Sequence, residues 1–155
     1  MKPVFIFKCL VICCLSYISS ACSYQQVPLQ TVFSANDCAI REPTIKSIDT
    51  AFELNNFFES MPVNFSQVPI AVPDVNYDEQ TLILYALGQQ PTSGYSIELT
   101  QDHATIKKQT LYLPVRVHRP KGGSYQAQLI TSPCKIFSLP HADYSEIVVD
   151  NILAD

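Results

Sequence analysis

Apolar side chains recur at every second position through most of the chain after residue 81, and this period of two constrains the fold most strongly. Such a period is typical of strands with one buried side and one side facing solvent. It predicts strands over residues 94–100 with a continuation to 106, and over 111–118, 125–130, 134–139 and 145–150. We therefore predict a mainly β fold, an antiparallel sandwich or a barrel-like sheet.

Three departures from strict alternation add detail. The segment Thr81–Leu87 (TLILYAL) is continuously apolar, which predicts a strand buried on both faces. Pro114 points outward from its strand and indicates an edge or a bulge there, because proline lacks the N–H that a ladder needs. Earlier in the chain, 27–33 and 44–48 are further strand candidates.

One helix is predicted, over about residues 49–61. Asp49 or Thr50 can cap it, and Thr50 with Glu53 fits a capping box. Four apolar side chains fall on one helical face, which we expect to pack on the sheet as the single N-terminal helix of the fold. They are Leu54, Phe57, Phe58 and Met61.

The direction of the strands predicts which loops share an end of the molecule. If every connection reverses direction, the loops 88–93, 119–123 and 140–144 all lie at one end. All four glycines of the chain lie between residues 88 and 123, at or beside two of these loops. Three loops at one end of a β scaffold form a contact surface, or they are ordinary hairpin turns.

The N-terminus has the three parts of a secretory signal peptide, which we assign to residues 1–21. Two lysines precede an uncharged apolar run of ten residues, too short to span a bilayer, and small residues follow. Ser20 and Ala21 stand directly before Cys22, as in a bacterial lipobox, so we expect Cys22 to be lipidated. The alternatives are plain cleavage near Ala21 and a buried first helix. Residues 22–74 then form an N-terminal segment with the helix, and residues 75–155 form a β domain.

Removing the signal peptide changes the charge and the cysteine count. The mature chain has 8 bases against 14 acids, which argues against nucleic acid as a partner. Cys38 and Cys134 remain, in a compartment where disulfides persist. A bridge between them would close a loop of about 97 residues and stabilise the fold by roughly 4–5 kcal/mol in the chain-entropy model. Two buried free thiols are the alternative, and a Cys134 nucleophile with His118 or His141 as its base is a third reading.

No catalytic, metal or cofactor motif stands out in the chain. The three histidines are scattered near turns and strand ends, and we interpret them as solvated surface side chains. Asp74, Asp78 and Glu79 cluster, but their spacing matches no calcium loop and favours a solvated turn. Arg116, Arg119 and Lys121 hold three of the eight mature bases, which indicates a partner site or a solvated loop. We expect a protein that is not an enzyme and binds neither metal nor cofactor.

The motif Gly88-Gln-Gln-Pro-Thr-Ser-Gly-Tyr-Ser-Ile97 resembles the G-x-x-P-T-G-G-Y-S-I signature of the C-terminal domain of the protease-complex subunit PrcB family. Residues 120–124 resemble the family's Pro-Gly-rich turn, and residues 126–133 resemble its polar strand that ends in Thr-x-Pro. Val75-Asn-Tyr-Asp78 stands where many members show Val-Asp-Phe. The resemblance implies an envelope lipoprotein that assembles with a secreted protease and supports its maturation or stability.

A looser resemblance joins residues 91–95 to the N-P-T-T-G-Y loop of chagasin-like cysteine-peptidase inhibitors, which present three loops from one end of a β fold. The tryptophan that follows this tyrosine in the family is absent. Tyr95 shares a face with Ile97 and Leu99, so we interpret it as a core anchor.

Together these observations predict a lipid-anchored bacterial envelope protein, periplasmic or facing the outer membrane, that binds a partner protein, with a secreted protease as the expected partner. A peptidase inhibitor and a structural envelope lipoprotein are the alternatives. The predicted partner-binding residues are Pro91, Thr92, Ser93, Gly94, Tyr95, Arg119, Pro120, Lys121, Gly122 and Gly123.

Overall fold

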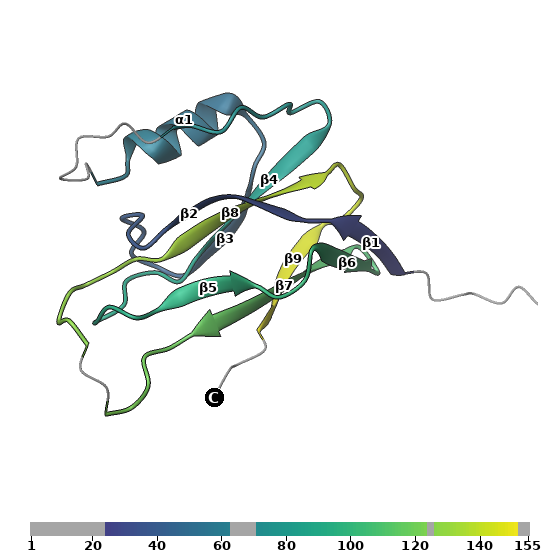
Figure 1. The fold of residues 1–155 in the computed structure, drawn as a ribbon. Coiled ribbons are helices and arrows are strands. Elements are labelled where there is room, and N and C mark those ends of the chain that lie inside the picture. The colour runs from purple at the N-terminus through teal and green to yellow at the C-terminus, as the bar shows by residue number, and fades with distance from the viewer. Residues whose placement is uncertain (1–23, 63–70, 124–125, 152–155) are drawn as a thin grey trace, which may run out of the picture.

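The computed structural model describes residues 24–62, 71–123 and 126–151, which form two β-sheets and one helix (Figure 1). The first sheet contains β1 (Tyr24–Pro28), β5 (Ser96–Leu99), β6 (His103–Lys107), β7 (Thr110–His118) and β9 (Glu146–Asn151). The second contains β2 (Gln30–Ala35), β8 (Cys134–Pro140), β4 (Gln80–Ala86) and β3 (Thr44–Ile48), in that spatial order. The helix is α1 (Ala51–Glu59). The predicted signal peptide and Cys22 lie outside the described residues.

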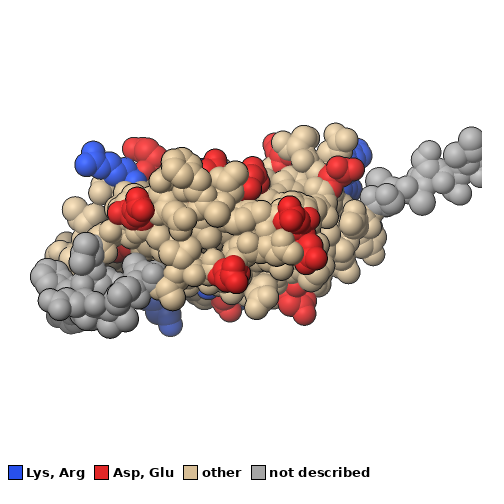
Figure 2. Space-filling view, turned by 90° about the horizontal axis from the view of Figure 1, so that it is seen from above, with Lys and Arg blue, Asp and Glu red and all other residues tan. Residues whose placement is uncertain are grey.

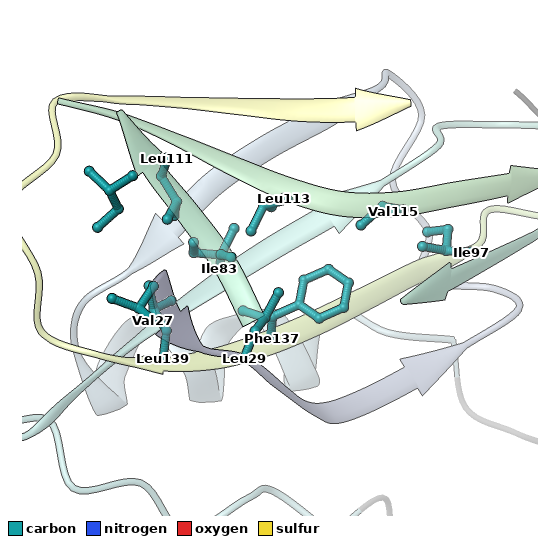
Figure 3. Close-up of a cluster of buried hydrophobic side chains, with 11 residues drawn as sticks. Val27, Leu29, Ile83, Ile97, Leu111, Leu113, Val115, Phe137 and Leu139 are labelled. Atoms are coloured by element: carbon teal, nitrogen blue, oxygen red, sulfur yellow. The ribbon is translucent and has the colours of Figure 1, made fainter. Parts of the chain in front are cut away.

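The helix and the two sheets lie in three layers, with the second sheet in the middle (Figure 1). Apolar side chains from both sheets fill the space between them, with Phe137 and Ile83 of the second sheet meeting Leu113 of the first (Figure 3). Burial of this apolar surface is the main force that holds the sheets together. The predicted mainly β fold with one packed helix is confirmed, in its sandwich form.

The strand β4, inside the second sheet, is buried on both faces, as the TLILYAL segment predicts. Ile83 of β4 faces the first sheet, whereas Leu82 and Leu84 belong to a second apolar cluster under α1. All three side chains are at most 1% exposed. A continuous apolar strand therefore serves two cores, and an alternating strand could not do so.

The helix begins and packs as its sequence predicts, although it is shorter than the predicted 49–61. Thr50 is the N-cap, and its side chain accepts a hydrogen bond from the backbone N–H of Glu53. The Glu53 carboxylate accepts from the N–H of Asp49, one residue earlier than in an ordinary capping box. Leu54, Phe57 and Met61 are buried against the second sheet. In the described part of the chain, no helix is long and apolar enough to cross a membrane.

The predicted strand 27–33 is in fact two strands that belong to different sheets. The chain leaves the first sheet after Pro28, buries Leu29, and enters the second sheet at Gln30. The backbone N–H of Leu29 donates to the carbonyl of Asp102 at this crossing. The alternation of Val27 with Leu29 continues across this crossing, so it could not show that the chain changes layers; within β2 the register is irregular between Thr31 and Phe33.

The strand β7 is central in the first sheet, with β5 and β6 end to end on one side and β9 on the other. Pro114 lies where the neighbouring strand is interrupted between β6 and β5, so its missing N–H disrupts no pair there. Pro114 therefore marks an interruption of the neighbouring strand, and the prediction of a sheet edge is wrong, because β7 has strands on both sides. β6 turns into β7 through Lys108 and Gln109, both with positive φ, as a two-residue hairpin requires.

Three further expectations from the sequence are wrong: the strand at 125–130, the direction of β8 and the antiparallel pairing of β9. The described residues 126–130 form no strand, so the connection from β7 to β8 does not reverse twice. As a result β8 runs antiparallel to β4, and Pro140 pairs with Gln80 at the start of β4. The loop 140–144 therefore lies at the opposite end from 88–93 and 119–123. In addition, β9 pairs with β7 in the parallel sense, not the antiparallel one.

Candidate functional site

Four segments meet at one end of the sandwich, and we call them together the loop end. They are residues 36–43 before β3, 87–95 after β4, 119–123 after β7 and 126–133 before β8. Backbone contacts or side-chain contacts join each segment to at least one of the others. The loop end occupies the left side of Figure 1, away from the start of β1.

Segment 87–95 is fastened to segment 126–133 by backbone hydrogen bonds. The N–H of Gln90 donates to the carbonyl of Thr131 over 2.7 Å, and the N–H of Thr131 donates back to Gln90 over 3.1 Å. The N–H of Ser93 donates to the carbonyl of Ala127. The hydroxyl of Thr131 donates to the carbonyl of Thr92. The residues of the Pro-Thr-Ser-Gly motif are thus held on a second segment, where an ordinary hairpin turn would stand free.

Segment 36–43 is held by a disulfide bond and by Ser132. Cys38 and Cys134 are bonded, with Cα atoms 6.1 Å apart, as the sequence predicts. The N–H of Cys38 donates to the carbonyl of Ser132, and the N–H of Gln89 donates to the carbonyl of Arg41. Because Cys134 is in this bond, it has no free thiol for the nucleophilic role.

Two glycines allow the segments to approach each other. Gly88 has φ +72°, and a Cβ there would lie 2.8 Å from the carbonyl oxygen of Arg41. Gly94 has φ +94°, and a Cβ there would lie 2.7 Å from Oε1 of Gln126 and 3.3 Å from Cγ of Pro120. Only glycine combines this backbone conformation with such close contacts. Gly94 therefore allows segment 87–95 to lie close to Pro120 of segment 119–123.

A cavity of about 200 Å³ opens between the two sheets at this end. Tyr85, Leu87, Tyr95 and Val117 form much of its wall, and Arg119 lies at its rim. Tyr95 is half-buried and lines the cavity, but it belongs to neither buried apolar cluster, so the prediction of a core anchor is not confirmed. The cavity is lined by Pro43, Tyr85, Leu87, Gln90, Tyr95, Val117 and Arg119.

Two adjacent apolar side chains are exposed at the loop end. Leu129 is 61% exposed and Ile130 is 63% exposed, and both lie on segment 126–133. Sequence reasoning missed them because it placed residue 129 on the inner side of a strand that the structure lacks. Together with the apolar wall of the nearby cavity they add apolar surface at the loop end, and large exposed apolar patches mark interaction sites.

The ten predicted partner-binding residues lie on two loops that do come together. Pro91, Gly94, Arg119 and Lys121 are exposed, with Gly122 and Gly123. Thr92, Ser93, Tyr95 and Pro120 are half-buried. The predicted third loop, 140–144, is not part of this surface. There, His141 bonds the hydroxyl of Thr81 through Nδ1 and the carbonyl of Tyr77 through Nε2.

A small charged cluster lies on the outer face of the first sheet, just below the loop end. Nε2 of His118 is 2.5 Å from Oε2 of Glu98, and Nη1 of Arg116 is 3.7 Å from the same oxygen. The hydrogen bond from His118 is the main cause that lowers the pKa of Glu98, and the positive charges nearby add to it. Because His118 precedes Arg119 directly, this cluster fixes the base of segment 119–123.

The described residues offer no group of three or more His, Cys, Asp or Glu side chains that could hold a metal ion. Asp74, Asp78 and Glu79 lie in the connection before β4, where Asn76 accepts the N–H of Asp78 in a turn. His103 bonds Asp102, which lowers the pKa of that aspartate.

The described chain is thus a β sandwich with a fastened loop surface at one end. Residues 81–140 match the family model described as PrcB C-terminal, which confirms the resemblance inferred from the motif at 88–97. The match begins in β4, ends in β8 and includes three of the four segments of the loop end. No curated protein and no solved structure matches the chain.

Proposed function

We propose that this protein is a non-enzymatic envelope lipoprotein, an accessory subunit that binds a partner protein through its loop end. The partner we expect is a secreted protease, as the PrcB family resemblance implies. The observation that carries the proposal is the construction of the loop end. A disulfide and backbone bonds hold segments 36–43, 87–95 and 126–133 together, Pro120 of the fourth segment lies close to Gly94, and Leu129 and Ile130 are exposed on this surface.

The position of the N-terminus supports a membrane-anchored arrangement. Tyr24 pairs with Lys107, next to the hairpin at Lys108, whereas the loop end follows His118 at the other end of β7. Nine residues of strand span about 30 Å. A lipid on Cys22, two residues before Tyr24, would therefore place the loop end on the side away from the membrane.

Capture from intact envelopes tests the proposal. A tagged full chain is crosslinked in cells, purified from the membrane fraction, and its adducts are identified by mass spectrometry. We expect a protease-containing adduct that is lost in the variant Leu129→Asp/Ile130→Asp. Phe52→Asp is the matched control, because Phe52 is 73% exposed on α1 and should tolerate the same change without loss.

Two results would count against the proposal. Recovery of no envelope protein by the wild-type chain would remove the accessory role. An adduct that survives the double variant and is lost in Phe52→Asp would move the binding surface to the helix. Separately, we expect Cys22→Ala to leave the membrane fraction, and its retention there would contradict the lipid anchor alone.

A further inference from the structure

Charge is distributed unequally between the loop end and the rest of the molecule. The loop end carries three bases and two acids, whereas the remainder of residues 24–151 carries five bases and eleven acids. Both acids of the loop end, Asp37 and Glu42, lie on segment 36–43. Segments 87–95, 119–123 and 126–133 have no acid, and they include Arg119 and Lys121. The face that carries α1 shows the contrast, with acidic side chains across it and Lys or Arg only toward its edges (Figure 2).

The cavity at the loop end combines apolar walls with a cationic rim. Tyr85, Leu87 and Val117 provide apolar surface, and the exposed Arg119 is the charged residue among those that line it. Among the described residues, Arg119 forms no ion pair with a carboxylate. By contrast, Arg116, on β7, lies beside Glu98. The guanidinium of Arg119 is therefore available to a carboxylate that comes from outside the chain.

We propose that the loop end recognises an extended acidic segment of the partner protein, in which a carboxylate side chain stands next to an apolar one. This inference rests on the proposed function. The apolar side chain enters the cavity between Tyr85 and Tyr95, and the carboxylate binds Arg119 at the rim. Leu129 and Ile130 pack on apolar surface that flanks the acidic segment.

Charge complementarity argues for this occupant over others. A basic segment would meet Arg119 and Lys121, and a second copy docked by the same loop end would bring the same two bases against them. An apolar segment without charge would leave the guanidinium at the edge of a closed contact with no partner, which is costly. A carboxylate beside an apolar group satisfies both parts of the site.

Two blocked peptides of equal length provide the probe. The first contains Leu-Glu-Val-Glu and the second contains Leu-Gln-Val-Gln, and both are acetylated and amidated so that only side-chain carboxylates differ. Their binding to the purified full-length mature protein in detergent is measured by the anisotropy of a peptide-borne dye. We expect the glutamate peptide to bind about tenfold more tightly, since a hydrogen bond to a charged group contributes about that factor. Raising the salt concentration should weaken the binding of the glutamate peptide more than the binding of the glutamine peptide.

Charge-reversal variants assign the effect to the site. Arg119→Glu should abolish the preference for glutamate, and Arg119→Lys should keep much of it. Lys107→Glu is the matched control, because it changes the net charge equally at the opposite end of β7. Equal binding of the two peptides, or equal effects of Arg119→Glu and Lys107→Glu, would overturn the inference.

Envelope capture separates this inference from the proposed function. If Arg119→Glu leaves the captured partner unchanged while Leu129→Asp/Ile130→Asp removes it, the accessory role stands and the acidic-segment inference fails. If the wild-type chain captures no partner but discriminates between the peptides as expected, the accessory role fails and the chemistry of the site stands.

Discussion

The hydroxyl of Ser132 both accepts a hydrogen bond from the backbone N–H of Ile40 and donates one to the carbonyl oxygen of Ile40. The two distances are 3.1 and 2.6 Å, and Ser132 is 2% exposed. The backbone of Ser132 also accepts the N–H of Cys38 and donates to the carbonyl of Asn36. One small side chain therefore completes the ladder between two segments that are about ninety residues apart in the sequence.

Replacing Ser132 with alanine should destabilise the protein by about 1–3 kcal/mol, because two backbone groups of Ile40 would lose their partner in a partly buried place. Urea unfolding measures the change. Ser138→Ala is the control: Ser138 donates to the side chain of Gln80, which can turn toward water, so its loss should cost less. If both variants lose the same free energy of unfolding, the two hydrogen bonds between Ser132 and Ile40 contribute no more than the single bond of Ser138.

The glycines of the loop end predict a graded series of alanine variants. Gly88→Ala should be the most destabilising, because its Cβ would lie within 2.9 Å of backbone atoms from Arg41 to Pro43, at a positive φ. Gly94→Ala should cost less, about 1–2 kcal/mol, because its closest contact is the movable end of Gln126. Gly122→Ala, with nothing within 4 Å, should be nearly neutral. Thermal unfolding of the three variants tests the order, and a destabilised Gly122→Ala would contradict it.

Local pattern was enough to predict most strands, the helix and the two loops that meet. Gly94–Thr100 and Leu111–His118 alternate plainly, and Thr50 with Glu53 marks the start of α1. Each of these features depends on residues a few positions apart. Their burial and capping are therefore visible without knowledge of the rest of the fold.

What the sequence could not predict depends on partners far along the chain. Residues 126–130 alternate like a strand, but they bond segment 87–95 at single points such as Ala127 to Ser93, so no ladder forms. Because residues 126–130 are not a strand, β8 runs in the direction opposite to the one inferred from the sequence, and the loop 140–144 lies at the other end of the molecule. Ser132 and Arg41 gave no signal either, because their roles arise only when segment 36–43 folds against segments 87–95 and 126–133.

The disulfide between Cys38 and Cys134 should make a large contribution to stability. It closes a loop of about 97 residues, for which the chain-entropy model gives roughly 4–5 kcal/mol. The double variant Cys38→Ala/Cys134→Ala should unfold at clearly lower urea concentration than the oxidised wild type. Prolonged treatment with a thiol reductant in mild urea should bring the wild type close to the double variant and leave that variant unchanged. If reduction has no effect on the wild-type midpoint, the bond is not formed in the purified protein.

The pair of Glu98 and His118 predicts how stability changes in acid. The pKa of Glu98 is lowered in the folded protein, chiefly by the hydrogen bond with His118. A carboxyl whose folded pKa lies below its unfolded value stabilises the fold above the unfolded value, and this contribution is lost as the pH falls through the folded pKa. Glu98→Gln should therefore be less stable than wild type at about pH 6, and the difference should shrink below the ordinary glutamate pKa of 4.5.

Thermal unfolding of wild type and Glu98→Gln at several pH values between about 6 and 3 measures that difference. Because both residues are exposed, the effect should be small and should decrease at high salt. Glu59→Gln is the control, since Glu59 is exposed on α1 and forms no ion pair with any described residue. If the difference in stability between wild type and Glu98→Gln does not change with pH, the titration of Glu98 does not contribute to stability. A difference that grows toward acid would reverse the inferred direction of the pKa shift.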